Sequence, residues 1–262
     1  MKKSGFTLAE VLITLGIIGV VAALTAPALV TSGQNQANAS RLAVTVSNIE
    51  NAFTNAISQE GVEKLSATKM WPSTAVTNSN VGTTYKTFAG NLGQYLHING
   101  YEEKNFGANY YGDNKPYYMS ATGGKSTSEA TLGGAVAYPV FLKNGAAVFF
   151  QITGGTVKDK TKIINAGGAL YDCRGEVIID VNGKSSPNVV GRDIFRFAIG
   201  NNGILYPLGG LDYAAYLTEG DKPEDKVWKK DDVTNLSCND GKIKNGWGCT
   251  ARVIEEGYKI NY

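Results

Sequence analysis

Four oxygen-bearing side chains between residues 180 and 193 have the spacing of a candidate cation site. This stretch begins with the pattern D-x-N-G, which calcium loops use because a hard cation needs oxygen ligands crowded on a tight turn. The candidate ligands are Asp180, Asn182, Asn188 and Asp193. The register does not fit an EF-hand, which needs further acids or amides at fixed offsets and a terminal Glu. The alternative is a turn without metal, in which Asn182-Gly183 supplies positive φ and Pro187 sets the return.

One acidic residue, Glu10, stands directly before the main hydrophobic segment of the chain. Residues 11–30 are uncharged and mainly apolar, and no charged residue occurs from Val11 to Ser40. As an α-helix, residues 11–30 would be about 30 Å long, which is the thickness of the hydrocarbon core of a bilayer. An acid inside a bilayer costs on the order of 2.5–3.5 kcal/mol on insertion scales, so such residues usually have a partner and a function.

The basic residues around this segment predict its orientation. Lys2 and Lys3 precede it and the next basic residue is Arg41, so the positive-inside rule predicts a cytoplasmic N-terminus and an exported body. Two plainer interpretations compete with a functional one. The first is a secretory signal peptide cleaved near residues 26–28, and the second is a simple signal anchor. Neither of them gives Glu10 a role.

The cysteines and the single histidine indicate a disulfide and argue against a zinc site. Cys238 and Cys249 enclose a short Gly-rich loop, so an exported body predicts a disulfide between them, with Cys173 left over. Loop-closure entropy makes such a bridge worth about 2–3 kcal/mol. The alternative is three unrelated reduced thiols. With no CxxC pair and with His97 as the single histidine, a zinc site of the usual kind is nearly excluded.

The element that follows the apolar run is an amphipathic helix over residues 41–58. Its apolar positions recur three or four residues apart, which is the spacing of one helical stripe. They are Leu42, Val46, Ile49, Phe53 and Ile57. The joint over residues 31–40 is polar and is either helical or loosened, and Pro27 should kink or loosen the helix before it. One long helix is therefore expected, with its second half packed on a globular body.

The globular body has the patterns of an antiparallel sheet. Asn144-Gly145 between two apolar runs is the strongest hairpin signal in the chain. The expected strands are 135–142, 146–152, 176–181, 193–199 and 204–208, with a helix near 88–96 and a loop-rich tail over 209–262. These elements predict an α+β fold in which a meander of four or five strands packs on one helix.

The N-terminal residues Gly5-Phe6-Thr7-Leu8-Ala9-Glu10-Val11-Leu12 resemble the processing site of type IV pilins and of the pseudopilins of type II secretion. The resemblance rests on a short basic leader, Gly, an aromatic residue, Glu four positions later and a long apolar run. It implies cleavage between Gly5 and Phe6 by a prepilin peptidase and N-methylation of Phe6. It also implies that Glu10 neutralises the N-terminal amine of a neighbouring subunit.

The resemblance implies a division of the chain and a location. Residues 1–5 would be the leader, 6–60 the long helix and 61–262 the exported head, with 6–30 first spanning the membrane and later forming the filament core. The expected partners are the prepilin peptidase, other pilin or pseudopilin subunits and the inner-membrane assembly platform. The protein would lie in the bacterial inner membrane in a single pass, with its N-terminus cytoplasmic, and then in a filament in the envelope or at the cell surface.

Several features narrow the function that this resemblance implies. The body is longer than that of a typical major pilin and lacks the compact calcium-loop signature of a major pseudopilin, which favours a minor or specialised subunit. The alternative is an adhesin or a substrate or DNA receptor displayed on the filament, with tyrosines of residues 85–118 available for stacking. A net charge of +2 argues against binding to nucleic acid. We find no enzyme motif, so a structural role is expected.

Overall fold

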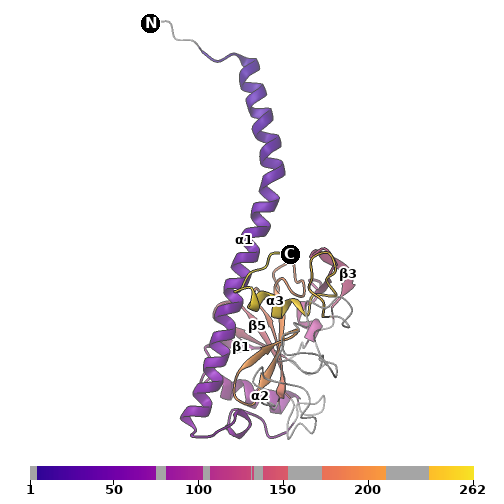
Figure 1. Cartoon of the computed structure of the whole chain (residues 1–262). Helices are drawn as coiled ribbons and strands as arrows, with labels where there is room; N and C mark the ends of the chain where they lie inside the picture. The colour runs from indigo at the N-terminus through magenta and orange to yellow at the C-terminus, as the bar shows by residue number, and fades with distance from the viewer. Residues whose placement is uncertain are drawn as a thin grey trace.

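The structure of the protein is a computed structural model that describes residues 5–74, 81–102, 107–130, 132, 138–152, 173–210 and 236–262. One long helix, α1 (Leu8–Gln59), runs along a globular head with its C-terminal half and projects away from the head with its N-terminal half (Figure 1). The head is built on an antiparallel sheet and has a loop-rich C-terminal region. This architecture confirms the expected pilin-like α+β fold.

Helix α1 is continuous over all of its residues, including the polar joint 31–40. Of the two expectations for that joint, the helical one is therefore correct. Pro27 lies inside the helix and does not break it, although proline removes one backbone donor. The Thr31 hydroxyl donates a 3.0 Å hydrogen bond to the Pro27 carbonyl in this region.

The main sheet has six antiparallel strands in the order β1-β4-β5-β6-β7-β8. The strands are β1 (Ile98–Tyr101), β4 (Pro139–Leu142), β5 (Ala147–Ile152), β6 (Cys173–Asp180), β7 (Ile194–Gly200) and β8 (Leu205–Pro207). Strands β4 to β8 form the predicted meander, and Gly145 turns the β4–β5 hairpin with a φ of 89°. The first predicted strand begins later than expected, at Pro139, and residues 133–137 lie outside the described part of the chain.

Several smaller elements complete the head. They are η1 (Leu65–Ala67), α2 (Val81–Leu92), η2 (Gly107–Tyr111), the hairpin of β2 (Tyr117–Met119) and β3 (Lys125–Glu129), and α3 (Cys249–Glu255). The predicted helix near 88–96 was placed too late, because α2 ends at Leu92 and Gly93 follows it. In the tail, α3 was not predicted, and residues 211–235 lie outside the described residues.

Both faces of the sheet are buried, and α1 covers one of them. The two faces are clearest along β5, where Val148 and Phe150 belong to the cluster under α1 and α2, and Ala147 and Phe149 to the opposite cluster. On α1, the predicted stripe faces the sheet: Leu42, Val46, Ile49 and Phe53 are buried and Ile57 is half-buried. The opposite face is covered by η2 and by parts of the C-terminal region.

Candidate functional site

The first turn of α1 places the Glu10 carboxylate against the backbone that precedes the helix. Thr7 is the N-cap residue, and its backbone N–H and its hydroxyl each donate a 2.8 Å hydrogen bond to Glu10 Oε2. In return, the Glu10 backbone N–H donates to Thr7 Oγ1 at 3.3 Å. This reciprocal pair is a capping box, which satisfies backbone donors that the first helical turn leaves without partners.

The capping box gives Glu10 a local role that the sequence analysis missed. A Thr followed three residues later by Glu, just before an apolar run, is the sequence signature of this motif, so Thr7 could have been found from the sequence. The carboxylate points back toward the start of the helix, where it accepts a hydrogen bond from the backbone N–H of Thr7, the residue that follows Phe6. A charge at this position is therefore available to a group at the N-terminal end of α1.

The N-terminal half of α1 exposes a continuous set of large apolar side chains. Leu8 is 78% exposed and Leu24 is 75% exposed, and the exposed positions continue to Val30; Phe6, just before the helix, is 89% exposed. The helix is long and apolar enough to cross a membrane by length and composition. Exposed apolar area on this scale marks a surface for lipid or for other protein chains.

The second candidate site is the connection between β6 and β7, where the structure brings all four predicted oxygen ligands together. Asp180 ends β6 and Asp193 directly precedes β7, and both side chains are fully buried. Asn182 Nδ2 lies 3.4 Å from Asp193 Oδ2, and the Asn188 backbone N–H donates to that same oxygen at 2.9 Å. Val189 N–H donates to Asp193 Oδ1 at 2.6 Å.

The expected turn is also present in this connection, and two further residues contribute to it. Gly183 has a φ of 63° and Asn188 a φ of 47°, so positive φ occurs at the two ends of the loop. The Tyr111 hydroxyl of η2 donates a 2.6 Å hydrogen bond to Asp180 Oδ2, and the Asn114 carbonyl accepts one of 2.8 Å from Asn188 Nδ2. No sequence pattern pointed to Tyr111 or Asn114, because both are remote from the loop along the chain.

The electrostatics of this cluster are unusual for two aspartates. Burial raises the pKa of Asp180 well above its usual range, and the nearby charge of Asp193 raises it further. Burial also raises the pKa of Asp193 to about 6, although the N–H groups of Val189 and Asn188 stabilise its charged form. No group of three or more His, Cys, Asp or Glu side chains gathers within the described residues, so a metal here would also need amide or carbonyl oxygens.

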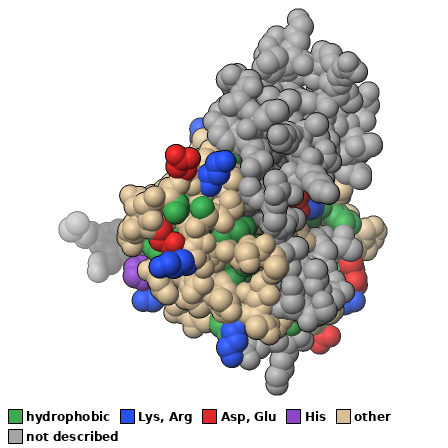
Figure 2. Space-filling view, turned by 90° about the horizontal axis from the view of Figure 1, so that it is seen from below, with side chains coloured by type: hydrophobic (Ala, Val, Ile, Leu, Met, Phe, Trp, Pro, Cys, Tyr) green, Lys and Arg blue, Asp and Glu red, His purple; other side chains and the backbone are tan. Residues whose placement is uncertain are grey.

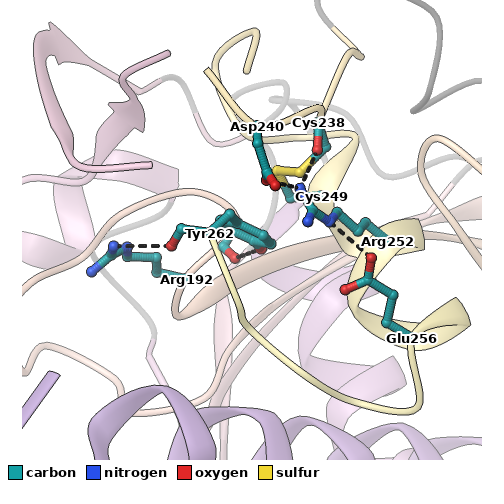
Figure 3. A network of polar contacts seen from close by, with 8 residues as sticks. Arg192, Cys238, Asp240, Cys249, Arg252, Glu256 and Tyr262 are labelled. Atoms are coloured by element: carbon teal, nitrogen blue, oxygen red, sulfur yellow. Dashed lines mark hydrogen bonds and ion pairs between the residues drawn. A yellow bond between two sulfur atoms is a disulfide. The ribbon is translucent and has the colours of Figure 1, made fainter. Parts of the chain in front are cut away.

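The expected disulfide lies in a third cluster, at the start of α3. Cys238 and Cys249 are bonded and both are buried. Arg252, one turn along α3, donates to the Cys238 carbonyl at 2.7 Å and to Asp240 Oδ1 at 2.6 Å (Figure 3). Its Nε also donates to Glu256 Oε1 at 3.1 Å. This cluster holds the C-terminal region together, and the Cys173 side chain lies outside the described part of the structure.

The tyrosines that could have formed a stacking surface are not exposed. Residues 85–118 contain seven tyrosines, all of them described, and each is buried or half-buried. Tyr85, Tyr110 and Tyr111 are in the core clusters. Among the described residues that Figure 2 colours, acidic and basic side chains are scattered, and neither sign gathers into a patch. These observations give no support to a tyrosine platform for sugars or bases.

Comparison with known proteins identifies the N-terminal segment. Residues 1–26 match the prokaryotic N-terminal methylation motif. No curated protein and no solved structure matches the chain. The matched motif and the apolar helix fit anchoring in the inner membrane before assembly, and the motif points to a structural protein of the pilin type. The chain thus begins with a type IV pilin-like prepilin segment, joined to a head with the pilin-like α+β architecture.

Proposed function

We propose that the protein is a structural subunit of a pilus or pseudopilus, and that it is a minor or specialised one. A prepilin peptidase cleaves between Gly5 and Phe6, Phe6 is N-methylated, and the helix then leaves the membrane to pack in a filament. The observation that carries the proposal is the methylation motif at the head of a helix whose N-terminal half exposes large apolar side chains. The size of the head supports a specialised position in the filament.

The proposed role of Glu10 in assembly follows from the geometry of the first turn. Cleavage would create a positively charged amine on Phe6, one residue before the N–H that Glu10 binds. In a low-dielectric filament core, a carboxylate and an ammonium attract strongly, and each would be costly to bury alone. Glu10 would therefore pair with the amine of a neighbouring subunit during packing.

Mass spectrometry of the mature N-terminus tests the processing. The protein is isolated from cells that contain the prepilin peptidase and from cells that lack it. We expect a chain that begins with methyl-Phe6 in the first case and an uncleaved chain in the second. A chain that begins after residues 26–28 in both strains would show that the segment is a signal peptide instead.

Three variants separate the charge of Glu10 from its capping role. Glu10→Gln removes the charge and keeps a capping box, since Gln also serves at this position, whereas Glu10→Leu removes both. Thr7→Ala removes the N-cap side chain, at about 1 kcal/mol of helix stability, and keeps the charge. We expect normal cleavage in all three and loss of co-purification with other filament subunits in the two Glu10 variants only.

The opposite pattern would overturn the charge-pairing role. If Glu10→Gln assembled normally while Thr7→Ala and Glu10→Leu failed, the capping box would account for the acid by itself. Cleavage is measured in the same samples, so a defect of processing is distinguished from a defect of assembly.

A further inference from the structure

The β6–β7 connection contains two buried carboxyl groups, and no cationic side chain of the described residues pairs with them. Asp180 and Asp193 are both fully buried, and no Lys or Arg of the described residues forms an ion pair with either. The two nearest basic residues in the sequence point elsewhere: Lys184 Nζ lies over the Tyr110 ring, 4.4 Å from its centre, and Arg192 donates to the Tyr262 carbonyl. Buried carboxylates are usually paired with a cation or coordinate a metal ion.

The same loop contains two buried oxygens that accept no hydrogen bond. They are Asn182 Oδ1 and Asn188 Oδ1. Asn188 is 1% exposed, and its backbone N–H contacts Asp193 Oδ2; the amide of Asn182 is directed at the same carboxylate through Nδ2. An unsatisfied buried acceptor costs about 1–3 kcal/mol, so two in one loop require an explanation. A cation bound in this loop would give these amide oxygens a partner.

The hydrogen bonds already present leave room for that cation. A carboxylate offers about four lone-pair positions. Asp180 accepts from the Tyr111 hydroxyl, from the Asn182 N–H and from the backbone of Gly183, so one of its positions stays open. Asn182 Nδ2 now makes only a long hydrogen bond of 3.4 Å to Asp193. Turning the amide by about 180° would put Oδ1 in the place of Nδ2, where it would face the ion.

The chemistry of these donors selects calcium. All four side chains offer oxygen, two from carboxyl groups and two from amides. The backbone carbonyls of Asn114 and Lys184 accept hydrogen bonds from Asn188 Nδ2 beside them. Ca²⁺ takes six to eight oxygen ligands of mixed kind in flexible geometry, whereas Mg²⁺ demands a near-ideal octahedron and keeps several waters. Softer metals favour imidazole or thiolate, which this cluster lacks in the described residues.

We propose that Asp180, Asn182, Asn188 and Asp193 form a calcium site in the head. Bound calcium would neutralise the two aspartates and lock the β6–β7 connection against η2, which already contributes the Tyr111 hydroxyl. This inference concerns the head only and does not depend on how the N-terminus is processed. It therefore stands or fails separately from the proposed assembly into a filament.

The test uses the full chain in detergent micelles, stripped of metal with a chelator. Thermal unfolding and titration calorimetry are recorded with CaCl2 and with MgCl2 at equal ionic strength. We expect a saturable calcium heat and a melting temperature that rises by about 5 °C or more at 100 times the dissociation constant. MgCl2 should give a clearly smaller shift. No calcium heat together with no shift, or an equal shift with MgCl2, would overturn the assignment to calcium.

Variants locate the site. Asp193→Asn keeps the size of the side chain and removes one charge, and we expect it to lose the calcium response. Asn182→Ala is the second variant, because Asn182 is only half-buried and its loss should leave the metal-free melting temperature close to that of the wild type. The matched control is Asp113→Asn, which removes an exposed acid next to Asn114 and should keep the full response. If Asp193→Asn does not fold, Asn182→Ala decides, and a full wild-type calcium response in it would overturn the proposal.

Discussion

Glu50 of α1 accepts a 2.9 Å hydrogen bond through Oε1 from the backbone N–H of Leu205 in β8. The two residues are 155 positions apart, so this bond joins the long helix directly to the edge strand of the sheet. Asn144 makes a similar connection from the β4–β5 turn, because its Nδ2 donates to Thr45 Oγ1 at 2.8 Å. Polar contacts at the edge strand β8 and at the β4–β5 turn thus fix how α1 lies on the sheet.

The Glu50 contact predicts a specific pH dependence. Burial raises the pKa of Glu50 above its ordinary value of 4.5, although the Leu205 N–H opposes the shift. The folded state then binds a proton more tightly than the unfolded state. The stabilisation that this bound proton provides is complete below the pKa of Glu50 in the unfolded chain. It is lost as the pH rises through the pKa of Glu50 in the folded chain. We expect the free energy of unfolding of wild type, relative to Glu50→Gln, to decrease as the pH rises above the ordinary glutamate pKa of 4.5.

Urea unfolding of the full chain in detergent micelles at a series of pH values measures this difference. Glu63→Gln is the control, because Glu63 is exposed in the loop that follows α1. The Glu50→Gln difference is compared with that of this variant at each pH. A Glu50→Gln difference that is flat or that increases with pH would contradict the assignment.

The packing of α1 on the sheet predicts a large difference between a buried and an exposed apolar position of this helix. Phe53 is fully buried, and its ring lies 6.0 Å from the Trp71 ring and 6.2 Å from the Phe150 ring, in edge-to-face geometry. Phe53→Ala should therefore cost about 3–5 kcal/mol. Val44 is 52% exposed on the same helix, and Val44→Ala should change stability by no more than about 0.5 kcal/mol. Denaturant unfolding measures both, and comparable losses would show that the helix packs in another register.

The disulfide predicts that reduction and mutation have the same effect. The bridge closes a loop with a sequence separation of 11, so Cys238→Ser/Cys249→Ser should lose about 2–3 kcal/mol of unfolding free energy. Reductant should destabilise the wild type by the same amount and leave the double variant unchanged. A wild type that is insensitive to reductant would mean that the bridge adds nothing to stability.

Arg252 makes a prediction that is separate from the disulfide. Its side chain supplies a donor to the carbonyl of Cys238, a fully buried residue, as well as ion pairs to Asp240 and Glu256. Arg252→Met leaves that carbonyl without this donor, which should cost about 1–3 kcal/mol. Lys259→Met removes the same charge from an exposed position and should be close to neutral. If Arg252→Met and Lys259→Met lowered the free energy of unfolding equally, the charge of Arg252 would explain its effect without the hydrogen bond to Cys238.

Local patterns in the sequence were sufficient for the elements that depend on nearby residues. The stripe of Leu42, Ile49 and Phe53 follows from helical spacing, and the β4–β5 turn follows from Asn144-Gly145, because each rests on contacts between residues close in sequence. Strand β1 has only four residues, two of them Asn99 and Gly100, so it has little strand propensity of its own. Its pairing with β4 is a long-range contact, which no local pattern specifies.

The same division applies to the two candidate sites. The sequence by itself determined the prepilin segment, since the methylation motif, which contains Gly5, Phe6 and Glu10, is defined by the order of residues at one chain end. The sequence also showed four oxygen-bearing residues close together between residues 180 and 193. Their spacing does not decide whether a carboxylate is hydrated or buried. Tertiary structure decided that, because η2 and the strands around the loop exclude water from Asp180 and Asp193 and leave two amide oxygens without donors. Burial is a property of packing between distant segments, and for that reason only the folded chain reveals it.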